Sequence, residues 1–121
     1  MMRRVLFFLA LLLLPAALLR AEDLRVAHIF SDHMVLQRES SVPVWGWGKP
    51  GTKVTVTTNW NDFQVETKVA ADGTWRVNVD TREFKKFASL NTMVIKSGKE
   101  EIRLNDILLG EVWICAGQSN M

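Results

Sequence analysis

A serine follows an apolar run near the end of the sequence. The run from Glu111 to Ala116 ends at Gly117, and Gln118, Ser119 and Asn120 come next. A nearly continuous apolar run of this length is typical of a strand that is buried on both faces. In open α/β sheets, ligands bind beyond the carboxyl ends of such strands, where a serine on a tight turn can face a crevice. Ser119 is therefore the candidate nucleophile.

The surroundings of Ser119 differ from the G-x-S-x-G elbow, because Met121 stands where the second glycine would be. A serine hydroxyl needs a base to remove its proton and fixed N–H donors for the oxyanion. His28 and His33 have the side chain whose pKa suits a base. Both lie in the segment expected to form a β domain, so we interpret them as polar surface or loop residues.

The remaining reactive groups favour structural roles. Asp32, next to His33, is interpreted as a turn residue that caps its own backbone. The single cysteine, Cys115, excludes an intrachain disulfide, and its neighbours Ile114 and Ala116 favour a buried thiol. The sequence has neither a cluster with metal-ligand spacing nor a glycine-rich phosphate loop, so we expect no metal and no cofactor.

Five tryptophans raise the alternative of a sugar-binding platform. Trp75 and Trp113 fall in apolar alternation and are expected in a core, while Trp45 and Trp47 share a strand face that suits a core or an interdomain contact. Trp60 lies among polar residues and is expected to be exposed. We therefore prefer the structural interpretation for most of the five.

The first residues have the pattern of an export signal. Arg3 and Arg4 precede an apolar run from Val5 to Leu14, and Pro15 ends this run before the small residues Ala16, Ala17 and Ala21. A membrane-spanning helix needs about 20 apolar residues, which is more than this run supplies. We predict a signal peptide at 1–21, export to the periplasm or the extracellular space, and no membrane contact after cleavage.

Net charge argues against nucleic acid as a partner. The sequence has 15 Lys and Arg against 13 Asp and Glu, a net charge of +2. Arg3, Arg4 and Arg20 belong to the predicted signal, which leaves 12 basic and 13 acidic residues in the mature chain. The basic excess is therefore lost with the signal, and neither nucleic acid nor an anionic membrane is expected as a partner.

Short β-type runs with turn residues between them fill the rest of the chain. We predict a mostly β domain at 22–109, an antiparallel β-sandwich of Ig-like or jelly-roll type. Its clearest hairpin is expected around Ala71-Asp72-Gly73, and a second one around Gly98-Lys99. Asn105-Asp106 is expected to be a connector, and a second domain to begin near Gly110. The expected strands are Leu24–Phe30, Met34–Leu36, Val42–Trp47, Thr52–Trp60, Phe63–Val69, Thr74–Val79, Asn91–Ser97 and Glu100–Leu104, with a helical turn or loop at Thr81–Ser89.

Several separate segments carry a resemblance to a known family. Ile114 to Met121 resembles the first block of SGNH-type hydrolases in their sialate O-acetylesterase-like branch, in which Gly-Gln-Ser-Asn holds the nucleophile. The segments 30–38 and 42–48 resemble the opening of the β-sandwich that precedes the hydrolase domain in those proteins. Asp72–Trp75 and Gly110–Trp113 match in the same order. The resemblance covers essentially all of residues 24–121.

The resemblance implies a secreted serine carbohydrate esterase that removes O-acetyl groups from sialic acids or other acetylated glycans. Ser119 would be the acyl-accepting nucleophile, and its backbone N–H one oxyanion donor. The base would come from a later Asp-x-x-His block, and further donors from later glycine and asparagine blocks. We therefore expect 110–121 to be the start of a truncated SGNH hydrolase domain, and this fragment alone to be inactive. The alternative is a non-catalytic β-sandwich spacer or a glycan-binding module.

Overall fold

The computed structural model describes residues 23–82 and 90–118, and this part of the chain contains strands and no helix. The mostly β prediction is thus confirmed. The predicted signal peptide and most of Thr81–Ser89 lie outside the described residues. The strands are β1 (Arg25–Val26), β2 (Val35–Gln37), β3 (Ser41–Trp47), β4 (Lys53–Thr58), β5 (Gln64–Lys68), β6 (Thr74–Asp80), β7 (Asn91–Ser97) and β8 (Glu100–Gly110).

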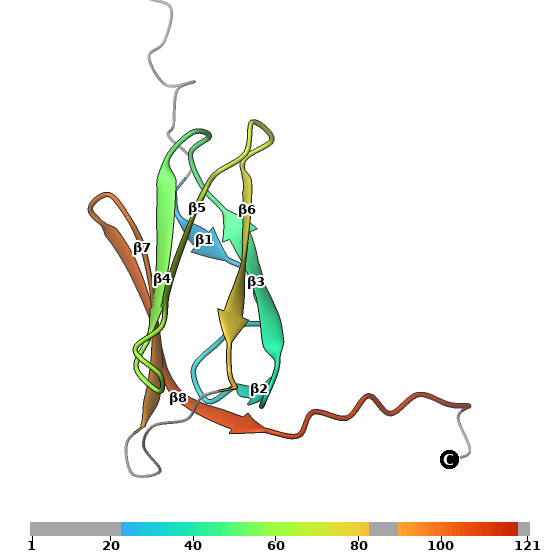
Figure 1. Cartoon of the computed structure of the whole chain (residues 1–121). Helices are drawn as coiled ribbons and strands as arrows, with labels where there is room; N and C mark the ends of the chain where they lie inside the picture. The colour runs from blue at the N-terminus through green and yellow to red at the C-terminus, as the bar shows by residue number, and fades with distance from the viewer. Residues whose placement is uncertain (1–22, 83–89, 119–121) are drawn as a thin grey trace, which may run out of the picture.

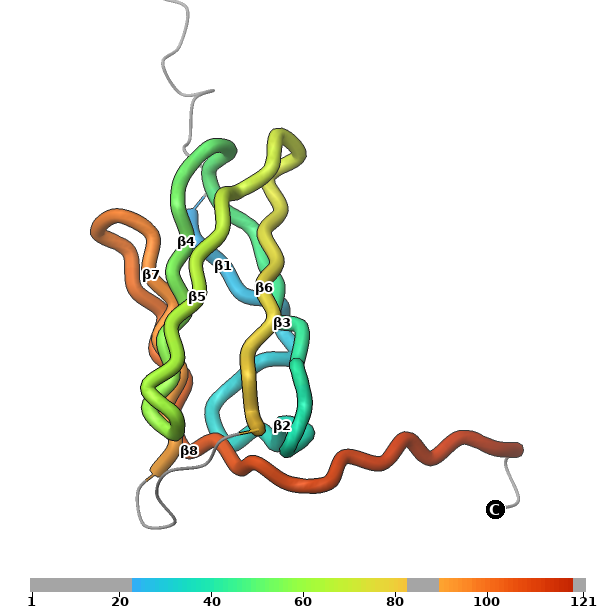
Figure 2. Tube along the Cα trace, viewed as in Figure 1, coloured from blue at the N-terminus to red at the C-terminus, as the bar shows by residue number. Residues whose placement is uncertain are grey.

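The strands form two sheets (Figures 1 and 2). One sheet has the order β1-β3-β6, and the other has the order β2-β8-β7-β4-β5. Every pair is antiparallel except β2 and β8, which run parallel with Val35 opposite Leu108. The all-antiparallel expectation was wrong for this pair, because β2 follows a turn that is attached to Asn105 and then runs alongside the end of β8. The choice between Ig-like and jelly-roll types stays a prediction.

The predicted hairpin around Ala71-Asp72-Gly73 is wrong. β5 pairs with β4, and β6 pairs with β3, so the turn joins strands of different sheets. The turn itself is tight, since Ala70 N–H donates to Thr74 O at 2.8 Å and Gly73 has a φ of 83°. The turn residues therefore predicted correctly where the chain reverses direction. They did not predict which strands pair, because pairing depends on which face of each strand is buried in the core. The second predicted hairpin, around Gly98-Lys99, is confirmed by the pairing of β7 with β8.

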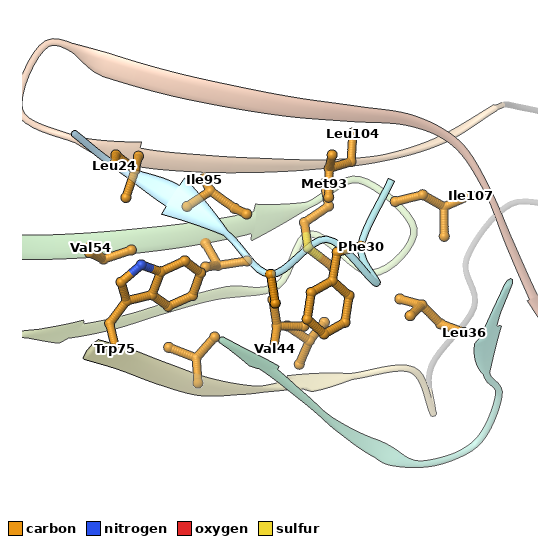
Figure 3. Packing of buried hydrophobic residues seen from close by; sticks show 14 of the residues in the cluster. Leu24, Phe30, Leu36, Val44, Val54, Trp75, Met93, Ile95, Leu104 and Ile107 are labelled. Atoms are coloured by element: carbon orange, nitrogen blue, oxygen red, sulfur yellow. The ribbon is translucent and has the colours of Figure 1, made fainter. Parts of the chain in front are cut away.

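The core lies between the two sheets. Val44 and Val79 of the first sheet and Val54, Met93 and Ile95 of the second are fully buried. Figure 3 shows side chains of both sheets in one cluster, with the Trp75 indole near Val54. Each fully buried side chain of this kind stabilises the fold by about 1.5–3 kcal/mol relative to an exposed one. This apolar layer fixes the alternation of β6, whose residues 75, 77 and 79 are buried.

Two of the five tryptophans are buried with their ring N–H groups satisfied. Trp75 is 2% exposed, as predicted, and its Nε1–H donates to Trp47 O at 3.1 Å. Trp60 is 1% exposed and donates to Asp80 O at 3.0 Å, so the expectation of an exposed Trp60 was wrong. Its polar neighbour Asn61 donates to the same carbonyl at 3.0 Å. The polar residues around Trp60 therefore bind the backbone near the buried ring.

The expected connector Asn105-Asp106 lies inside β8, which continues to Gly110. Asp106 has a φ of 53°, and the register against β7 shifts between Asn91 and Met93. An irregularity of this kind bends a strand without ending it. β8 therefore carries the chain beyond the point where the polar pair indicated a break.

Within residues 23–82 and 90–118, no helix is long and apolar enough to cross a membrane.

Candidate functional site

The candidate nucleophile, Ser119, lies outside the described residues, and the structure describes the chain that leads to it up to Gln118. Residues 111–118 have no regular secondary structure and are exposed. Figure 1 shows this segment leaving β8 and running away from the sheets. The expected strand from Glu111 to Ala116 is therefore absent here, because β8 ends at Gly110 and no described strand pairs with the segment.

The apolar side chains of this segment are exposed. Val112 is 50% exposed, Trp113 82% and Ile114 93%, and Cys115 is an exposed free thiol. The predictions of a core position for Trp113 and of a buried Cys115 are wrong for this structure. Burial requires apolar atoms on the other side, and none of the described residues covers the segment.

The start of the segment is held by Gln37, the last residue of β2, and by Arg38, which follows it. Gln37 Nε2–H donates to Glu111 Oε2 at 3.1 Å, and Gln37 Oε1 accepts from Val112 N–H at 2.9 Å. Arg38 places its Nε 3.0 Å from Glu111 Oε1, and its backbone N–H donates to Gly110 O at 2.9 Å. We call these contacts of Gln37 and Arg38 with residues 110–112 the exit clamp. They set the direction in which the chain leaves the sheet.

The two histidines are polar surface residues, as predicted. His28 is exposed, and the side chain of His33 is 76% exposed with Nδ1 2.6 Å from Asp106 Oδ2. His33 has a φ of 65°, and its backbone N–H donates to Asn105 O at 3.0 Å. His33 thus attaches the turn before β2 to the irregular part of β8.

Asp32 lies in a turn, as predicted, but its side chain does not cap its own backbone, so that part of the expectation was wrong. Its Oδ1 accepts from the backbone N–H of Asn105 at 2.7 Å, a residue far along the sequence. Asp32 and His33 together grip Asn105-Asp106 through side chains and backbone. The pair therefore fixes β2 beside β8 and supplies no dyad.

Two carboxylates are held ionised by local hydrogen bonds. The pKa of Asp72 is lowered mainly by the Thr74 hydroxyl, which donates to Oδ1 at 2.7 Å, and then by the Thr74 backbone N–H. The pKa of Asp80 is lowered first by the side chain and then by the backbone N–H of Arg82. A general acid or base needs a pKa near the working pH, so neither carboxylate suits that role at neutral pH.

No group of three or more His, Cys, Asp and Glu side chains in the described ranges is arranged to hold a metal ion. The described residues thus offer surface anchors for the segment before Ser119.

The fold is similar to part of a solved enzyme. A crystal structure of a carbohydrate acetylesterase from Xanthomonas citri matches with a TM-score of 0.68 and 28% sequence identity, over 80% of this chain and 21% of that chain. No family model matches the sequence. In fold and in sequence, the chain is thus similar to a carbohydrate acetylesterase.

The curated relatives that match the chain are sialate O-acetylesterases. The sialate O-acetylesterases of Mus musculus and Homo sapiens are each 35% identical over 103 residues, which is 80% of this chain. That of Rattus norvegicus is 34% identical over 121 residues, or 93% of this chain. The chain is thus similar to sialate O-acetylesterases, as its motifs indicated. It spans about a fifth of the length of these relatives, between 19% and 22%.

Proposed function

We propose that these residues are the β-rich N-terminal portion of an exported serine esterase that removes O-acetyl groups from sialic acids or other acetylated glycans. The observation that carries the proposal is the similarity to sialate O-acetylesterases over most of the chain. In this proposal residues 1–21 are the export signal, 22–109 the β domain, and 110–121 the start of the hydrolase domain.

Ser119 is the proposed nucleophile. Its hydroxyl attacks the carbonyl carbon of the acetyl ester, its proton passes to a base, and its backbone N–H donates to the oxyanion. The sugar hydroxyl leaves, and water then releases acetate from the acyl-serine. The described part of the chain contributes position: the exit clamp attaches residues 110–112 to the β domain, eight or so residues before the serine.

A second candidate is a non-catalytic module, either a spacer or a glycan-binding domain. The observation that favours it is that every residue of 111–118 is exposed, so the segment adds nothing to the core of the β domain. The core therefore closes without the residues that lead to Ser119. In this alternative, Gly-Gln-Ser-Asn has no catalytic role.

Acetate release from an O-acetylated sialic acid by a longer protein that carries these residues distinguishes the two candidates. Ser119→Ala is expected to lower kcat/KM by about a thousandfold or more, since a serine esterase without its nucleophile keeps little activity. Ser31→Ala, a change in an exposed loop, is the matched control. Turnover that is unchanged by Ser119→Ala would refute the esterase proposal. Residues 22–121 alone are expected to release no acetate above background.

A further inference from the structure

The outer face of the β1-β3-β6 sheet carries two tryptophans beside two arginines. The register places Trp45 of β3 opposite Arg76 of β6, and Trp47 opposite both Arg25 of β1 and Thr74 of β6. Residues directly opposite each other on a sheet have Cβ atoms about 4.5–5.5 Å apart, so these side chains are neighbours. We call Arg25, Trp45, Trp47, Thr74 and Arg76 the outer tryptophan face.

This face is hollowed. A shallow groove of about 360 Å³ is lined by Trp45, Gly46, Trp47, Thr74, Trp75 and Arg76. Small-molecule sites have volumes from about 300 Å³ upward, so the groove suits one sugar residue rather than a long chain. The groove therefore offers a place for a small ligand away from the segment that leads to Ser119.

The two tryptophans are not equally available to a ligand. The Arg25 guanidinium lies over the Trp47 ring, with Cζ 5.3 Å from the ring centroid. The Trp45 ring is held edge-on by Phe30, with centroids 4.9 Å apart, and remains 38% exposed. A ring that is fixed on one side and open on the other loses little entropy when it stacks on the apolar face of a sugar. Trp45 is thus the stacking residue.

Two arginines bring positive charge to the groove: Arg76 lines it, and Arg25 lies over the ring of Trp47. Arg38, Arg82 and Arg103 each lie within ion-pair distance of a carboxylate. Among the residues that the structure describes, Arg25 and Arg76 have no such partner. The carboxylate of Asp72, at the Thr74 end of the groove, accepts hydrogen bonds from Thr74. An unpaired guanidinium presents a planar donor fork that matches a carboxylate. The exposed Arg76, opposite the stacking ring, therefore suits an anionic ligand.

We propose that the outer tryptophan face binds a carboxylated sugar residue of a glycan, with Trp45 stacking on the sugar ring and Arg76 donating to its carboxylate. Arg25 adds positive charge at the other end of the groove. The choice of a sialic acid as the natural sugar rests on the proposed function, whereas the need for a carboxylate rests on the two arginines. The site would hold the glycan without taking part in the chemistry at Ser119.

The probe is the α-methyl glycoside of N-acetylneuraminic acid, titrated into the mature protein and followed by the tryptophan indole N–H signals in NMR spectra. Trp45→Leu identifies the Trp45 signal by its loss. Saturable binding that shifts this signal is expected, and Arg76→Gln should weaken the affinity about tenfold, the usual loss of a charge-assisted bidentate contact. Arg103→Gln, an exposed arginine on the other sheet, is the matched control and should leave the affinity unchanged.

The carboxamide of the same glycoside tests the charge requirement, and it should bind about as weakly to the unmodified protein as the acid binds to Arg76→Gln. Three outcomes would each overturn the proposal. These are an equal loss of affinity in Arg76→Gln and Arg103→Gln, equal affinity for the acid and the amide, and no saturable shift of the Trp45 signal. Trp45→Leu removes part of a contact with Phe30, so Arg76→Gln decides the matter if that variant does not fold. Binding is measured without hydrolysis, so failure of the esterase proposal in the Ser119→Ala test leaves this result separate.

Discussion

The backbone N–H of Val112 donates to Oε1 of Gln37 at 2.9 Å, although the two residues are 75 positions apart in the sequence. The same amide donates from Nε2 to Glu111 at 3.1 Å. A side-chain amide that both donates and accepts is fixed in orientation, and it fixes the backbone that it contacts. The exit of the chain from β8 is therefore defined by a residue of β2, its parallel neighbour.

Gln37→Ala is expected to free the exit segment and leave the fold intact. The clamp is exposed, so the loss in free energy of unfolding should be small, about 0.5–1 kcal/mol. Amide hydrogen exchange at Val112 should accelerate at least tenfold. Gln64→Ala, at an exposed position of β5, serves as the control. An unchanged exchange rate at Val112 would show that the clamp does not hold the segment.

Gly46→Ala is expected to destabilise the β domain strongly. A Cβ at this position would lie 1.9 Å from the Arg25 carbonyl oxygen and 2.8 Å from Cζ2 of the buried Trp75. The oxygen belongs to the backbone of the paired strand β1, so β1 and β3 would have to separate. We expect a loss of about 3 kcal/mol or more in urea denaturation.

Gly110→Ala is the matched control for Gly46→Ala. Its Cβ would meet Val35 Cγ1 at 3.5 Å, which is ordinary van der Waals contact. This variant should unfold within about 0.5 kcal/mol of the parent. Equal stability of the two alanine variants would contradict the close approach of β1 to β3.

Asp72→Ala is expected to lower stability at neutral pH but not in acid. Hydrogen bonds from Thr74 lower the pKa of Asp72 from its ordinary value of 3.8, so the stabilisation is present above that value. It is lost as the pH falls through the lowered pKa and the native carboxylate gains its proton. The difference in denaturation midpoint between parent and variant should therefore be constant from pH 7 to pH 5 and shrink below pH 3.8. Asp23→Ala is the control, and a difference that persists at pH 2 would refute the explanation.

Local pattern predicted the strands far better than their partners. The alternation of Trp75, Val77 and Val79 is enough to place β6 and its buried face. The same residues do not say whether β6 pairs with β5 or with β3, because that depends on contacts between distant segments. The prediction that Trp60 is exposed was wrong for a related reason. Its polar neighbours indicate contact with solvent, yet Asn61 donates to the carbonyl of Asp80, 19 positions away. Such a partner is not visible in a short window.

The candidate site was likewise predicted only in part. Ser119 was singled out by its motif, which is local in sequence, although it lies outside the residues that the structure describes. The exit clamp could not be predicted, because Gln37 and Glu111 are 74 positions apart. Both lie in segments that carry the family resemblance, but a resemblance does not say which side chains meet. Arg76 was also missed as a candidate. Its only sequence signal is a polar position in the alternation of β6, and its significance comes from the register that sets it opposite Trp45.

The exposed apolar segment after β8 is expected to cause self-association when residues 22–121 are produced alone. Trp113 and Ile114 are 82% and 93% exposed, and they lie beside Val112 at 50%. A contiguous apolar stretch of this kind is a site for contact with other chains. Replacing both residues together, Trp113→Ser and Ile114→Ser, should raise the fraction of monomer in sedimentation velocity and should not change the unfolding midpoint, because neither side chain is part of the core.

A single exposed apolar side chain is not the basis of this prediction, since other apolar side chains of the protein are also exposed. Leu90 is 71% exposed, so Leu90→Ser is the matched control and should leave the monomer fraction unchanged. Residues 22–109 lack the whole segment and should be monomeric at the same concentration. If 22–121 is as monomeric as 22–109, the exposed segment is no association site. In a longer protein that carries these residues, the same side chains should instead be protected, which hydrogen exchange at Trp113 and Ile114 would reveal as slower rates than in 22–121.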